Sequence, residues 1–157
     1  MDWLKTMNLD VHVSEGQEIT VLGLIGDTSR VDMELLNSLE IVDSVLDTKD
    51  AFWHAKNVTV YDSVVKGEYL AWYAENIRFV RCKIIGTQPL CYVKGLVLED
   101  CTMDGCDLSF ENSEVHATVC GHIDSVKNPH FGFIQADSIG QIILDEYKWD
   151  GECEIRT

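Results

Sequence analysis

Apolar and small residues recur every 19 positions along most of this chain. The first apolar column consists of Leu39, Val58, Ile77, Leu96, Val115 and Ile134, and the second of Ile41, Val60, Phe79, Leu98, Ala117 and Ala136. A third column holds the small residues Ser44, Ser63, Cys82, Cys101 and Cys120, and it ends at the sixth copy, where Ile139 stands. A fixed period of this length predicts a solenoid, in which each repeat forms one coil that stacks on its neighbours.

The content of the repeats indicates strands rather than helices. Segments such as VTVYDSVV, IRFVRCKII and LVLEDCTM alternate apolar with polar residues and are rich in β-branched side chains. No amphipathic run of helical length interrupts them, and the spacings of leucine-rich and ankyrin repeats do not fit. The sequence therefore predicts an all-β, right-handed parallel β-helix of about 19 residues per coil.

One coil is predicted in detail. Strands are expected at residues 58–61, at 63–66 beyond a bend near Asp62, and at about 69–73, which makes three short strands per coil. One corner is expected at the aligned glycines Gly67, Gly86 and Gly105, since glycine tolerates positive φ and close backbone approach. The last corner is expected at Asn57 and Asn76, because asparagine tolerates a left-handed backbone.

The repeat also sets the expected domain organisation, a single β-helix domain over residues 1–157. Residues 32–144 are predicted to form the regular coils, and 1–31 an N-terminal cap or degenerate coil in which EITVLGLIGDT is a strand. Residues 145–157 are acidic, and we expect an irregular C-terminal cap or tail. If the N-terminal cap covers its coil poorly, end-to-end stacking of two chains into a homo-oligomer would cover the exposed backbone groups.

Charge restricts the partners. The formal charge is −15, from 27 acidic and 12 basic residues, and no cluster of Lys and Arg is present. This balance argues against nucleic acid and against an anionic membrane surface as partners. The first residues, MDWLKTMNLD, do not resemble a signal peptide and no apolar run approaches a membrane span, so we predict a cytoplasmic protein. The six cysteines form no CxxC pair, and we expect reduced thiols that pack as small hydrophobes, with no metal and no cofactor.

Several segments resemble a known family. These segments are DTKDAFWHAKNVTV, VVKGEYLAWY, CKIIGTQPLCY, CDLSFENSEV and IDSVKNP. They closely resemble an uncharacterised bacterial family, domain-of-unknown-function family 3737, over roughly residues 35–145. Its members resemble pectate-lyase-like right-handed β-helices. The resemblance implies a fold, and it assigns no activity and no residue roles.

The third predicted strand contains the candidate site residues. Strict alternation would place Trp53 inside, with Ala51 and the equivalent pairs Leu70/Trp72, Pro89/Cys91 and Leu108/Phe110. The same alternation would place His54, Tyr73, Tyr92 and Glu111 in one outward column, each 19 residues from the last. An outward aromatic column can serve as a sugar platform, as a protein contact surface, or only as a support between adjacent coils.

Two functions follow as hypotheses. The first is a non-enzymatic binding or scaffold protein, in which Tyr73, Tyr92 and His54 contact a glycan or a protein partner. The alternative is a carbohydrate-active enzyme of lyase, hydrolase or epimerase type, and its candidate catalytic residues are His54, Glu68, Asp107 and Glu111.

A further column contains the charged residues Asp62, Arg81 and Asp100. Asp62 and Asp100 lie two coils apart with Arg81 between them, roughly 10 Å at the usual spacing of parallel strands. That separation is too large for both carboxylates to hold one calcium ion, and the guanidinium would repel it. This column is therefore interpreted as a ladder of alternating charges.

Overall fold

The computed structural model describes residues 10–15, 20–25, 40–145 and 151–157, and none of these residues is helical. The chain divides into two compact units, Met1–Leu36 and Asn37–Thr157. In the first unit β1 (Asp10–Glu15) pairs antiparallel with β2 (Thr20–Ile25), which confirms the strand predicted within EITVLGLIGDT. The role of residues 1–31 as a cap stays a prediction. No helix that could span a membrane occurs in the described part of the chain.

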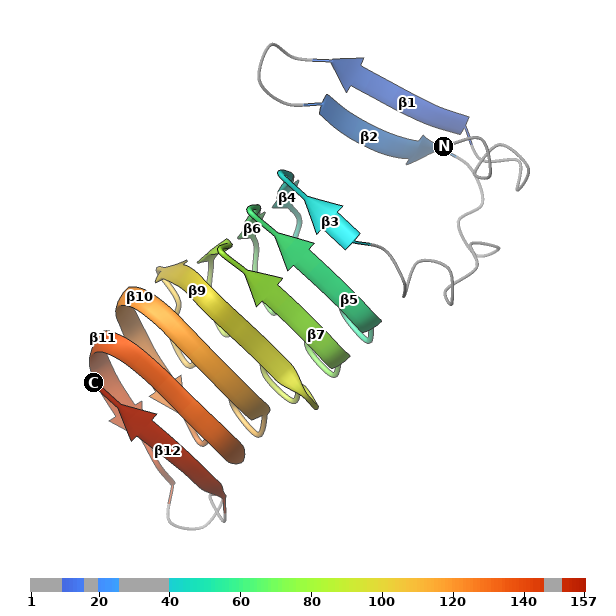
Figure 1. The fold of residues 1–157 in the computed structure, drawn as a ribbon. Helices are drawn as coiled ribbons and strands as arrows, with labels where there is room; N and C mark the ends of the chain where they lie inside the picture. Colours follow the sequence, from blue (N-terminus) through green and yellow to red (C-terminus); the bar gives the residue numbers. More distant parts are fainter. Residues whose placement is uncertain (1–9, 16–19, 26–39, 146–150) are drawn as a thin grey trace. The chain divides into compact units, whose positions relative to one another are not determined.

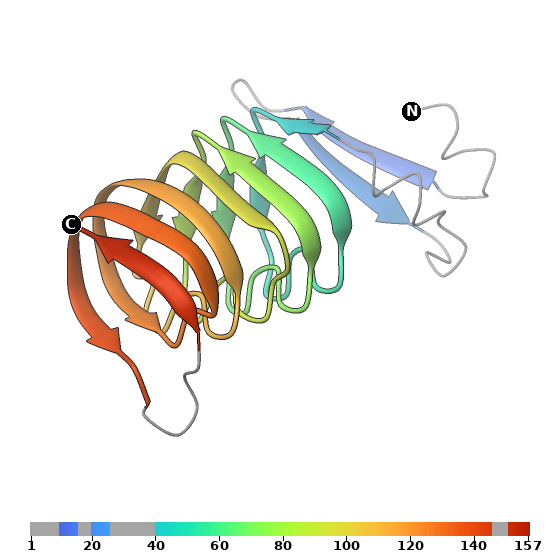
Figure 2. The same ribbon diagram turned by 60° about the horizontal axis from the view of Figure 1, so that its bottom comes forward.

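The second unit is a parallel β-solenoid, as the repeat predicted. Figures 1 and 2 show its coils stacked one behind another, with equivalent strands side by side. The main sheet has the order β12-β11-β10-β9-β7-β5-β3, and a second sheet joins β4, β6, β8 and the end of β9. The strands are β3 (Glu40–Val42), β4 (Val45–Asp47), β5 (Lys56–Tyr61), β6 (Val64–Lys66), β7 (Glu75–Val80), β8 (Lys83–Ile85), β9 (Leu96–Asp104), β10 (Glu114–Lys127), β11 (Phe131–Ile143) and β12 (Glu152–Arg156).

The register confirms the 19-residue period through the first coils. Val60 pairs with Phe79, Phe79 with Leu98, and Leu98 with Ala117. All four side chains are buried, because equivalent inward positions of successive coils stack along the axis. The apolar columns therefore form one continuous core.

The small-residue column ends one coil earlier than predicted. In four coils a residue with φ of 47° to 52° turns the chain between the two sheets, at Asp43, Asp62, Arg81 and Asp100. The next coil lacks this corner residue, so Val119 pairs with Cys101, and Cys120 is exposed instead of internal.

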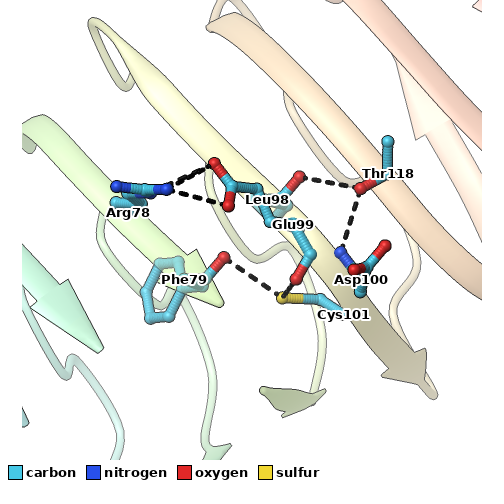
Figure 3. A network of polar contacts seen from close by, with 7 residues as sticks. All are labelled: Arg78, Phe79, Leu98, Glu99, Asp100, Cys101 and Thr118. Atoms are coloured by element: carbon cyan, nitrogen blue, oxygen red, sulfur yellow. Dashed lines mark hydrogen bonds and ion pairs between the residues drawn. The ribbon is translucent and has the colours of Figure 1, made fainter. Parts of the chain in front are cut away.

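A threonine side chain compensates for the missing corner. The Asp100 N–H donates to Thr118 Oγ1 at 2.9 Å, and that hydroxyl donates to the Leu98 carbonyl oxygen at 3.3 Å, as Figure 3 shows. In the other coils the corner N–H donates to a backbone carbonyl, as Arg81 does to Glu99 at 2.8 Å. The Thr118 hydroxyl thus replaces a backbone acceptor.

The last apolar pairs are shifted by two residues relative to the prediction. Val115 pairs with Gly132 and Ala117 with Ile134, so the step is shorter than 19 residues here. Ile134 and Ala136 are nevertheless buried, because a slip of two residues leaves every side chain on its original face of the sheet. The residues at these positions were therefore correctly predicted to be buried, but the predicted pairing of Val115 with Ile134 and of Ala117 with Ala136 was wrong.

In the coils that begin with β3, β5, β7 and β9 the third side is not a strand, so the prediction of three strands per coil is wrong for these coils. In the coil that begins with β5, Tyr69, Ala71 and Tyr73 have φ near 55° and the segment forms turns. Its N–H groups still bond to neighbouring coils, as from Ala71 to the Ala51 carbonyl oxygen at 2.8 Å. Because alternate residues adopt the left-handed conformation, the side chains do not alternate between faces as they do in a strand. Leu70 and Ala71 both point inward, whereas Tyr73 is exposed.

Both predicted corners are confirmed. A Cβ at Gly86, where φ is 130°, would lie 1.8 Å from the Gly67 carbonyl oxygen, so only glycine fits there. Asn57 and Asn76 have φ of 56° and 54°, and their side-chain amides bond to each other at 3.0 Å.

Ion pairs also run from coil to coil. The guanidinium of Arg81 binds both carboxylate oxygens of Asp62 at 2.7 Å, as the predicted charge ladder requires. This hydrogen bond from Arg81 lowers the pKa of Asp62 below its ordinary value. Arg78 makes an equivalent pair with Glu99 at 2.8 Å (Figure 3).

The C-terminal residues add another strand. β12 pairs parallel with Phe131–Gln135 of β11, so the irregular conformation predicted for residues 145–157 is wrong for 152–156.

The cysteines are free thiols, and four of them, Cys82, Cys91, Cys101 and Cys106, are buried in the solenoid. Burial raises the pKa of the Cys91 and Cys106 thiols to about 12.

Candidate functional site

Three rings form a stacked column on the turn side of the solenoid. His54 and Tyr73 stack with ring centroids 5.4 Å apart and planes 16° apart, and Tyr73 and Tyr92 stack at 4.9 Å and 11°. His54 and Tyr73 are exposed and Tyr92 is half-buried. The predicted outward column is therefore confirmed in its geometry. Its ring faces lie against each other, so mainly the ring edges meet solvent.

A second group of rings widens this column into a surface. Trp53, predicted to be inside, is 42 % exposed, because the turn conformation at Phe52 and His54 directs it outward. Its ring lies 5.9 Å from that of Trp72 and 6.3 Å from that of Tyr73, tilted by about 40° to both. We call the six rings of Trp53, His54, Tyr69, Trp72, Tyr73 and Tyr92 the aromatic face.

Trp72 holds the aromatic face together. Its Nε1–H donates to the Gln88 carbonyl oxygen at 2.7 Å, and its ring meets those of Tyr69 and Tyr92 edge to face at 4.9 and 5.3 Å. Lys49 Nζ lies 5.3 Å from the centroid of the Tyr69 ring. These contacts fix the rings before any ligand binds.

A pocket of about 220 Å³ opens along the edge of the stacked rings. It is lined by His54, Tyr73, Ala74, Glu75, Tyr92 and Lys94. The carboxylate of Glu75 pairs with Lys56 Nζ at 3.0 Å. The pocket thus joins aromatic edges to two charged side chains of opposite sign.

A half-buried ion pair closes the column at its C-terminal end. Lys127 Nζ lies 3.0 Å from Glu111 Oε1, and the two side chains are only 23 % and 17 % exposed. Burial raises the pKa of the neighbouring Tyr92, and the Glu111 carboxylate adds to the shift. Tyr92 therefore stays a neutral phenol at physiological pH.

A family model described as a protein of unknown function, DUF3737, matches residues 5–156. The chain belongs to the DUF3737 family. The matched range is wider than residues 35–145, where the sequence motifs placed the resemblance. No curated protein and no solved structure matches this DUF3737 chain.

The predicted catalytic residues of the DUF3737 chain do not converge. Glu68 lies 3.8 Å from Lys49 Nζ, Asp107 accepts a hydrogen bond from the Thr87 hydroxyl, and Glu111 pairs with Lys127. His54 stacks on Tyr73, and along its column it is separated from Glu111 by Tyr73 and Tyr92. Three coil steps correspond to about 14 Å, far beyond the reach of a shared proton transfer.

The DUF3737 chain also contains a polar cluster that the sequence analysis missed. His122 Nδ1 lies 2.9 Å from Ser138 Oγ, and His122 Nε2 lies 3.8 Å from Asp124 Oδ1. The histidine and aspartate side chains are about half exposed, and the second distance exceeds that of a hydrogen bond. The cluster therefore lacks the aligned carboxylate–imidazole contact that activates a serine. In the described residues no group of three His, Cys, Asp or Glu is arranged to hold a metal ion.

Lys94 was not among the predicted site residues, although the repeat contains a signal for it. Lys56, Glu75 and Lys94 are each 19 residues apart, so one carboxylate stands between two ammonium groups in adjacent coils. One acid can neutralise only one of the two lysines, and this signal was present in the repeat.

Proposed function

We propose that this protein is a non-enzymatic binding protein whose aromatic face contacts a glycan. The observation that carries the proposal is the outward Trp53 ring, 42 % exposed beside a pocket with polar walls. Sugars present apolar C–H faces and a rim of hydroxyls, and they match a surface in which fixed rings adjoin a few hydrogen-bonding groups.

The geometry assigns different roles to the rings. Both faces of Tyr73 are occupied, one by His54 and the other by Tyr92, so Tyr73 offers an edge and not a platform. Trp53 is tilted away from its neighbours and is the ring that a sugar can stack on. This assignment moves the centre of the predicted binding surface from the tyrosines to the tryptophan.

The border of the aromatic face favours a glycan over a protein. Two lysine–glutamate pairs lie along it, Lys49 with Glu68 and Lys56 with Glu75. The cores of protein–protein interfaces are depleted in lysine and glutamate, because burying them costs desolvation energy. Glycan hydroxyls, in contrast, accept and donate hydrogen bonds to such groups without burying them fully.

The enzymatic alternative has weaker support. A general acid and a general base must both reach the scissile group, within about 3 Å or through one water. Glu68, Asp107 and Glu111 each engage a different partner, as described above.

A glycan array and a polysaccharide-degradation screen test the proposal. We expect the wild type to bind at least one glycan class without cleaving it, and Trp53→Ala to weaken binding by about tenfold or more. Phe131→Ala is the matched control, since Phe131 on β11 is 52 % exposed and lies outside the aromatic face. Equal losses in both variants, turnover of the bound glycan, or binding only to a protein partner would overturn the proposal.

A further inference from the structure

Lys94 differs from every other basic residue whose side chain the structure describes. Nine basic side chains lie within residues 43–145 and 151–157, and eight of them form an ion pair with a carboxylate. Within those residues only Lys94 has no such partner. In a chain with 27 acidic residues and a formal charge of −15, an uncompensated ammonium is unexpected.

This ammonium lines the pocket on the aromatic face. It shares the pocket with the edges of His54, Tyr73 and Tyr92. Glu75 is the acidic residue of the lining, and its carboxylate is engaged 3.0 Å from Lys56. The two charged side chains of the lining are of opposite sign, but Glu75 is already paired with Lys56, so Lys56, Glu75 and Lys94 together place a charge of +1 at the pocket.

Such a local charge selects a ligand with one negative charge. A carboxylate matches it, whereas a phosphate dianion would leave an excess negative charge beside Glu75. At about 220 Å³ the pocket is smaller than the roughly 300–1,000 Å³ of sites for drug-sized ligands. It therefore fits one small unit of a longer ligand, with the next unit lying toward Trp53.

We propose that the pocket binds the carboxylate of an acidic sugar, and that Lys94 is the residue that recognises the charge. This inference rests on the proposed glycan-binding function and specifies its ligand class. Trp53 supplies the stacking surface, the tyrosine edges supply polar contacts, and Lys94 distinguishes a uronate from a neutral sugar.

Calorimetric titration with matched ligands tests the inference. The probes are gluco-, galacto- and mannuronate oligosaccharides, each compared with its methyl ester, which has the same ring and lacks the charge. For the uronate series that binds, we expect the free acid to bind the wild type about tenfold more tightly than the ester. Lys94→Met should abolish this difference and leave the affinity for the ester unchanged.

Lys83→Met is the matched control for charge. Lys83 pairs with Asp104 at 3.1 Å on another side of the solenoid, and its replacement changes the net charge by the same amount. This variant should retain the preference for the acid. Equal affinities of the wild type for acid and ester, or an equal loss in both lysine variants, would refute the role of Lys94 while leaving glycan binding intact. Absence of binding to every acid and ester would overturn the inference about acidic sugars, whereas the glycan array decides the proposed function separately. Trp53→Ala distinguishes stacking from charge recognition, because it should weaken the binding of acid and ester equally.

Discussion

The stacked column makes a quantitative prediction for Tyr73. Its ring contacts His54 on one face at 5.4 Å and Tyr92 on the other at 4.9 Å. Two stacked pairs at a partly exposed position together contribute about 1–2 kcal/mol to the free energy of unfolding, in addition to the contribution from the area that they bury. The side chain is 44 % exposed, so roughly 100 Å² is hidden, and this burial contributes about 2 kcal/mol. We therefore expect Tyr73→Ala to lower the free energy of unfolding by about 3 kcal/mol.

Urea unfolding, followed by circular dichroism and by tryptophan fluorescence, measures this loss. Phe131→Ala removes an aromatic ring that is 52 % exposed, and by the same burial of area it should cost about 2 kcal/mol, without the contribution of the stacked column. A double-mutant cycle between Tyr73→Ala and Tyr92→Ala should give a coupling of about 0.5–1.5 kcal/mol. A loss at Tyr73 no larger than that at Phe131, or a coupling near zero, would show that the stack does not stabilise adjacent coils.

Three further predictions concern the solenoid. Cys120 is exposed, whereas Cys153 is half-buried and the other four cysteines are buried. A thiol reagent at about pH 8 should therefore modify one thiol rapidly in the native protein and six in urea, and Cys120→Ser should remove the rapid phase. The pair that lowers the pKa of Asp62 stabilises the protein above the ordinary pKa of 3.8 and loses this effect as the pH falls through the lower folded-state value. The stability difference between wild type and Asp62→Asn should thus be largest near neutral pH and disappear once the pH falls below the lowered pKa of Asp62, and a pH-independent difference would contradict the assignment. Gly86→Ala should lower the free energy of unfolding by more than about 3 kcal/mol, because its Cβ would lie 1.8 Å from a carbonyl oxygen. Gly105→Ala should lower it by about 1–2 kcal/mol through its positive φ alone, because a Cβ there has nothing within 4 Å. Similar losses of stability for the two variants in thermal unfolding would disprove the steric argument.

The repeat in the sequence predicted the stacking because equivalent residues of parallel coils share one environment. Val60, Phe79 and Leu98 are buried in one column, and this shared burial is what a fixed period records. Corner glycines and asparagines were predictable for a similar reason, since few residues tolerate positive φ. Phe52 and Leu90 were not predictable, because bulky residues with φ of 63° contradict their ordinary preferences. The error at Trp53 followed from assuming strand alternation in that segment.

Chemical similarity concealed the other errors. Cys120 suits the small-residue column as well as Cys101 does, so the deleted corner left no trace in the composition. Ile134 likewise suits the position opposite Val115, although it pairs with Ala117. The outward column of His54, Tyr73 and Tyr92 survived the wrong strand assignment because 19-residue spacing alone brings those rings together.

The hydroxyl of Thr118 suggests how solenoids of this kind change their cross-section during evolution. Each coil contacts only its two neighbours, so a deletion must be accommodated at those two interfaces and nowhere else. At the deleted corner a single side-chain oxygen accepts the Asp100 N–H that would otherwise be left without a protein partner. A coil can therefore lose a residue in one mutational step if a threonine or serine already stands beside the corner. The same substitution gives protein designers a way to taper a β-solenoid without rebuilding its core.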